Sequence, residues 1–231
     1  MIEYQEIIIR NENNEWDIGG TSVTSRNWVK LFFNTLLLGG VVTLIVSFFV
    51  KSDAYMMALQ PFNAFELLGV MLTFLGFGFI FSVISQMGFF AYLTVHRFGL
   101  GIFKSYWIPI QIGLILFAVF DLVYFPYQKA AEEASIWPYI LTATIITICS
   151  VAVAYVKAQQ TNQKAFIPAL FFMIVVTAIE WVPAINVSDV DYTLLMIFPL
   201  FACNAYQLLL LHKLNSPQQS ANSAKHATSK K

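Results

Sequence analysis

The sequence predicts an all-α, polytopic integral membrane protein, built as a bundle of six transmembrane helices. Of its 231 residues, 58% are hydrophobic and only 11% are charged, whereas about 25% of the residues in soluble domains are charged. The apolar residues also fall in long runs, and a bilayer core about 30 Å thick needs about 20 apolar residues per helix. The connections between these runs are short, so we expect no soluble domain outside the membrane.

Short polar or proline-containing segments separate the six apolar runs. The first run stops at Lys51, Ser52 and Asp53. The second run is longer than one membrane thickness, so it must tilt, bend or lie along the interface. The predicted helices cover residues 28–50, 64–95, 106–125, 136–156, 166–182 and 190–211.

The distribution of basic residues predicts the orientation. With the N-terminus inside, every lysine and arginine except Lys51 and Lys129 falls on the cytoplasmic side. Cytoplasmic loops of membrane proteins are enriched in these residues. We therefore expect a multi-pass protein of the cell membrane with both termini in the cytoplasm.

The two ends of the chain differ in composition from the membrane domain expected at residues 25–214. Residues 1–24 are polar and acidic, and Gly19-Gly20 can be encoded by a ribosome-binding-like stretch, so translation could begin at Val23. Residues 215–231 are rich in Ser, Gln, Asn, Ala and Lys. Such a composition cannot bury apolar surface and predicts a disordered tail.

Sequence motifs for catalysis are absent. There is no glycine-rich phosphate loop, no His-Glu-x-x-His, no Cys-x-x-Cys and no Gly-x-Ser-x-Gly. Thirteen basic residues balance thirteen acidic ones, which gives no electrostatic case for nucleic acid. We therefore expect no enzyme activity, no cofactor, no metal site and no nucleic-acid partner.

Among the carboxylates of the apolar runs, Glu66, Asp121 and Glu180 are the candidates for function. Ionisable groups within a membrane are costly and are candidates for function. All three are expected in the outer third of the bilayer, where they could line an outward-facing cavity for a cation, a proton or a cationic ligand. The alternative is that each reaches water or a neighbouring polar group near the headgroups.

Amides and glycines within the runs are candidates for helix contacts. Buried amides commonly bond across helices, and glycines let helix backbones approach closely. The amides are Asn34, Gln86, Gln111, Asn204 and Gln207. The residues selected as candidate contacts, within the bundle or with another membrane protein, are Gly76, Gly78, Gln86, Gly88 and Gln111.

Several segments resemble the KinB-signalling pathway activation protein (KbaA) family of spore-forming Bacillus relatives. The most specific block is SQMGFFAYLTVHRFG at 85–99, and the similarity covers about 25–214. Shorter matching segments are SRNW at 25–28, GFIFSV at 78–83, FDLVY at 120–124 and EWVP at 180–183.

The resemblance implies a membrane protein required for signalling by a membrane histidine kinase at the onset of sporulation. Its expected partners are a KinB-like kinase and the lipid bilayer, and direct helix contact would bias the kinase between two states. Two alternatives remain open: a small transporter or ligand sensor that uses the carboxylates, and an intramembrane enzyme that would need them paired at one depth.

Overall fold

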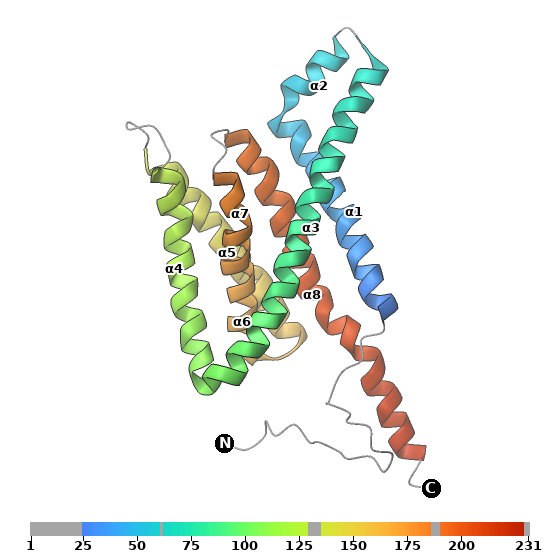
Figure 1. The fold of residues 1–231 in the computed structure, drawn as a ribbon, viewed down its shortest axis with the longest axis vertical. Coiled ribbons are helices and arrows are strands. Elements are labelled where there is room, and N and C mark those ends of the chain that lie inside the picture. The colour runs from blue at the N-terminus through green and yellow to red at the C-terminus, as the bar shows by residue number, and fades with distance from the viewer. Residues whose placement is uncertain (1–24, 61, 129–134, 186–189, 229–231) are drawn as a thin grey trace.

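The computed structural model describes residues 25–60, 62–128, 135–185 and 190–228. Within these ranges the fold is all-helical without a β-strand, which confirms the predicted fold class (Figure 1). The elements are α1 Ser25–Val50, α2 Ser52–Leu59, α3 Ala64–Phe103, η1 Lys104–Tyr106, α4 Trp107–Gln128, α5 Trp137–Gln160, η2 Gln163–Ala165, α6 Phe166–Phe171, η3 Phe172–Val176, α7 Thr177–Ile185 and α8 Val190–Thr228.

Five stretches of the described chain are long and apolar enough to cross a membrane. The longest of them is Ala64–Gln128, which contains both α3 and α4 because the short helix η1 joins the two without an interruption. The presence of six separate membrane spans therefore remains a prediction. Lys104 has a positive φ of 47° and ends α3, and α4 turns back along the bundle from there (Figure 1).

α3 is longer than the expected 64–95, since it extends to Phe103 over 40 residues. At 1.5 Å per residue such a helix is about 60 Å long, and it runs diagonally across the bundle (Figure 1). Its first turn is capped by Asn63, whose Oδ1 accepts hydrogen bonds from the amides of Phe65 at 3.2 Å and Glu66 at 3.4 Å. An Asn at this position satisfies amides that have no helical partner.

α1 packs along α3 and α8, and α3 also packs on α8. The closest approach lies at Gly78, where an added Cβ would be 2.7 Å from the carbonyl oxygen of Gly39 and from the Cα of Gly40. Only glycines allow two helix backbones to come this near.

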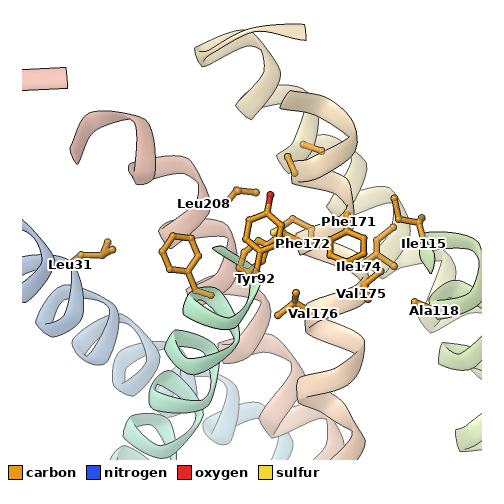
Figure 2. Close-up of a cluster of buried hydrophobic side chains, with 14 residues drawn as sticks. Leu31, Tyr92, Ile115, Ala118, Phe171, Phe172, Ile174, Val175, Val176 and Leu208 are labelled. Carbon is orange, nitrogen blue, oxygen red and sulfur yellow. The ribbon is translucent and has the colours of Figure 1, made fainter. Parts of the chain in front are cut away.

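The stretch α6–η3–α7 forms the centre of the bundle. Phe172, Met173 and Ile174 in the π-helical turn η3 are 0%, 0% and 1% exposed. Figure 2 shows this turn surrounded by side chains from α1, α3, α4 and α8, including Leu31, Tyr92 and Leu208. Because a π-turn holds one extra residue per turn, several consecutive side chains can face the core here.

The other helices present large apolar side chains to the outside. Phe49, Phe65 and Leu116 are 76%, 89% and 67% exposed. A water-soluble protein rarely leaves so many such side chains in contact with solvent. Together with the five apolar stretches, this surface indicates association with a membrane.

Two parts of the described chain differ from the sequence expectations. The polar segment after Lys51 forms the short helix α2, which buries Tyr55 and Ala58. α8 continues to Thr228, whereas the composition of 215–231 predicts a disordered tail. Extending an existing helix costs less than starting one, which accounts for helix at residues with moderate propensity. Residues 1–24, including the expected start at Val23, lie outside the described residues.

Candidate functional site

A buried group of polar side chains joins α3, α7 and α8. Asn204 is its centre: its Oδ1 accepts from the Ser85 hydroxyl at 2.6 Å, and its Nδ2 donates to Thr177 Oγ1 at 3.0 Å and to Glu180 Oε2 at 2.6 Å. Gln207 Nε2 donates to Ser85 Oγ at 2.7 Å and to the carbonyl of Cys203 at 3.1 Å. We call Ser85, Thr177, Glu180, Asn204 and Gln207 the polar network, and all five are buried.

A second set of contacts continues from α3 to α1. The Ser82 hydroxyl donates to the carbonyl of Thr35 at 2.8 Å, and Gln86 Nε2 donates to Ser82 Oγ at 3.2 Å. In an apolar surrounding each bond between helices stabilises the bundle by about 0.6 to 2 kcal/mol. The central helices are therefore held in one rotational setting by hydrogen bonds as well as by apolar packing.

Glu180 has one carboxylate oxygen in the polar network and one without a partner. Among the described residues, Oε1 is buried and accepts no hydrogen bond. It lies beside Gly88 of α3, where an added Cβ would collide with this carboxylate and with Val176. The absence of a side chain at Gly88 therefore leaves the space that the Glu180 side chain occupies. The unpaired, buried Oε1 makes Glu180 a candidate for function.

The three candidate carboxylates occupy three different surroundings. Glu66 is exposed in the first turn of α3. Asp121 lines a cavity of about 210 Å³ between α4 and α7, whose other walls include Phe117 and Trp181. Glu180 points instead to α3 and α8. No contact or cavity of the described residues brings these three carboxylates together.

The candidate contact residues also separate into different roles. Gly78 and Gly88 pack inside the bundle, as described above, whereas a Cβ added at Gly76 meets nothing within 4 Å. The Gln111 Nε2 lies 3.4 Å from His96 Nδ1, and the Oε1 of this buried side chain has no hydrogen-bond partner among the described residues.

The face of α3 that carries Gly76 is exposed and apolar. Its residues follow one another at intervals of three or four, which places them on one side of a helix. Leu72 and Met87 are 65% and 68% exposed, and an added Cβ at Gly69 also meets nothing within 4 Å. We call this face the outer stripe, and it consists of Gly69, Leu72, Gly76, Ile80, Val83 and Met87.

Sequence reasoning identified part of the polar network. The expectation that membrane amides bond across helices is confirmed for Asn204 and Gln207, while Asn34 is exposed. Ser85 and Thr177 were not among the candidates. The interval of three between Asn204 and Gln207 puts both on one helix face and could have indicated a polar partner there.

The sequence is similar to those of known proteins. The family model described as KbaA, KinB-signalling pathway activation in sporulation, matches residues 39–214. The KinB-signaling pathway activation protein of Bacillus subtilis (strain 168) is 45% identical over 192 residues, which are 82% of this chain and 97% of that protein. No solved structure shows a significant match. On this evidence the chain belongs to the KbaA family.

Proposed function

We propose that this chain is a multi-pass membrane protein that activates KinB signalling in sporulation through direct contact with the membrane helices of a KinB-like kinase. The family and the Bacillus subtilis relative are both named for this pathway, and neither name is that of an enzyme. The observation that carries the contact mechanism is the outer stripe, where Gly69 and Gly76 face open space. Helices associate in membranes through small residues that let backbones approach.

The proposed topology has six spans, formed by α1, α3, α4, α5, the α6–α7 stretch and α8, with both termini in the cytoplasm. The connections from α3 to α4 and from α5 to α6 lie at the end of the bundle opposite α2 (Figure 1). They contain Lys104 in η1 and Lys164 in η2. The positive-inside rule assigns the lysine-bearing end to the cytoplasm. This arrangement leaves the outer stripe within the bilayer, where a kinase helix can reach it.

The proposed mechanism is a shift between two kinase states. An activator changes such an equilibrium only by the difference in its affinity for the two states. Moving a kinase from about 1% to about 99% active would need a difference of about 5.5 kcal/mol, although a smaller difference gives partial activation. Contacts along the outer stripe supply this difference in affinity if the kinase helices fit the stripe better in the active state than in the inactive state.

The test is complementation of a strain that lacks this gene, read with a reporter of early sporulation genes. Gly76→Leu should fail to restore the reporter, because the leucine separates the kinase helix from α3. Gly113→Leu on α4 is the matched control, since a Cβ at Gly113 also meets nothing within 4 Å, and it should complement fully. Equal complementation by both variants at equal membrane abundance would reject the outer stripe as the contact.

A kinase variant that is active without its sensor segments shows at which step of the pathway the Gly76→Leu strain fails. If this variant restores the reporter in the Gly76→Leu strain, the protein acts at or above the kinase membrane domain. If the reporter stays silent, the defect lies downstream or in membrane physiology.

The alternative function is a small transporter or ligand sensor, and it is supported by the unpaired oxygen of Glu180. Glu180→Gln keeps an oxygen that can accept from Asn204, so the fold should persist. A transporter or sensor that binds a proton or cation at Glu180 would lose function in this variant at unchanged abundance. The contact mechanism instead expects near-normal signalling, and Asp121→Asn provides the same comparison at the α4 cavity.

A further inference from the structure

A second polar region lies where α5 turns into α6. Asn162 Oδ1 accepts from the amide of Ala165 at 3.1 Å, and the Thr161 hydroxyl donates to the carbonyl of Lys157 at 2.8 Å. Beside this turn is a cavity of about 480 Å³ that also reaches α3 and α8. Its polar lining residues are Tyr92, His96, Lys157, Thr161, Asn162 and Lys164.

Lys157 is the most constrained of these groups. Its side chain is 5% exposed, and its Nζ donates to the carbonyl of Leu208 at 2.6 Å. An ammonium group carries three protons, so this bond uses one of them. Among the described residues, no Asp or Glu lines the cavity, and no carboxylate is bonded to Lys157. Burying a charge without an opposite charge is costly, and a bound anion removes that cost.

The other polar groups also favour an anion. His96 Nδ1 accepts from Trp107 Nε1 at 3.1 Å, which places the proton of a neutral ring on Nε2 as a donor. The Tyr92 hydroxyl is not a donor to the anion, because its single proton is donated to the carbonyl of Pro168 at 3.1 Å. Lys164 adds a second positive charge to the lining. The part of the lining that the structure describes thus carries two basic side chains and no acidic one.

We propose that this cavity binds a phosphate group, supplied either by the headgroup of an anionic phospholipid or by a phosphate-bearing solute. Lys157 and Lys164 contact the phosphate oxygens, and His96 donates a further hydrogen bond. The apolar side chains of Leu93, Leu208 and Leu211, which also line the cavity, suit the glycerol and upper acyl chain of a lipid. The site is separate from the outer stripe and does not depend on kinase contact.

The test uses the purified full chain in a mild detergent, with its thermal transition followed as ligand is added. Phosphatidylglycerol, phosphatidylcholine and inorganic phosphate are the probes. Phosphatidylglycerol should raise the transition of the wild type, and phosphatidylcholine should not. Lys157→Gln with Lys164→Gln should raise the half-saturating concentration at least about tenfold, because each basic contact with an anionic lipid surface is worth about 1 kcal/mol.

Lys104→Gln is the matched control, because Lys104 is an exposed lysine that does not line the cavity, and it should bind as the wild type does. If Lys157→Gln prevents folding, Lys164→Gln alone must still weaken binding, since Lys164 is exposed. A shift with phosphatidylglycerol alone identifies a lipid headgroup, and a shift with inorganic phosphate as well identifies a free phosphate group. No shift with either probe, or equal shifts in the double variant and the wild type, overturns the proposal.

Discussion

The two faces of α3 are built from similar residue types but lie in different surroundings. Gly78, Ser82 and Ser85 face inward, where they contact α1 or α8 directly. Gly76 and Ile80 lie on the opposite face, where Ile80 is 55% exposed and Gly76 has no neighbour. What distinguishes the faces is that the serine hydroxyls on the inner one bond to other helices. A glycine on the inner face serves the packing of helices, whereas the space beside the glycine on the outer face is open.

The largest loss of stability is expected for Gly78→Leu. The added side chain would meet backbone atoms of Gly39 and Gly40 at 2.7 Å, and backbone cannot move aside as a side chain can. The substitution should destabilise the fold by at least about 3 kcal/mol and greatly lower membrane abundance. Immunoblots of membrane fractions and the thermal transition of purified protein measure this, and wild-type stability would contradict the packing of α1 on α3.

A smaller loss of stability is expected for Asn204→Ala. The variant removes the bonds to Ser85, Thr177 and Glu180 and leaves these buried groups without their partner. The cost should be about 2 to 4 kcal/mol. Asn34→Ala is the matched control, because Asn34 is an exposed amide in another apolar helix, and its transition should hardly change. Equal effects of the two substitutions would mean that the polar network does not stabilise the bundle.

Gly88→Ala tests the space beside Glu180. The methyl group collides with the carboxylate that Asn204 holds, which should cost about 1 to 2 kcal/mol. The collision with the carboxylate disappears if Glu180 is also changed to Ala, and only the contact with Val176 remains, so the two substitutions should be less than additive. A double-mutant cycle on the thermal transition gives the coupling, and strict additivity would show that the two residues do not meet.

The smallest effect on stability is expected on the outer face. Gly76→Leu adds a side chain where nothing lies within 4 Å, so the free energy of unfolding should change by no more than about 0.5 kcal/mol. The contrast with Gly78→Leu separates folding from signalling. A strongly destabilised Gly76→Leu protein would remove this contrast.

Hydropathy alone predicted the helical membrane fold, because each apolar run is long enough to be recognised as a helix that can span a bilayer. It did not predict α2, since Lys51, Ser52 and Asp53 at its start are typical of a loop. The helix forms there because Tyr55 and Ala58 bury their side chains, which is a tertiary effect.

The candidate site was only partly predictable because a sequence gives the depth of a residue in a helix better than the direction in which it faces. Gly76 and Gly78 were equal candidates, yet two residues are about 200° apart around a helix, so they face opposite ways. Glu66, Asp121 and Glu180 were placed at similar depth, but the rotation of each helix separates them. Pairing Ser85 with Asn204 required the packing of α3 on α8.

The central claim is that the outer stripe contacts a kinase helix. Its most direct test is disulfide or photochemical crosslinking in native membranes from Ile80→Cys to cysteines or probes placed in the transmembrane segments of the kinase. Leu116→Cys on α4 is the control, since Leu116 is similarly exposed at 67%. We expect a crosslinked complex from position 80 and none from position 116. No crosslink from position 80, or equal crosslinking from both positions, would contradict it.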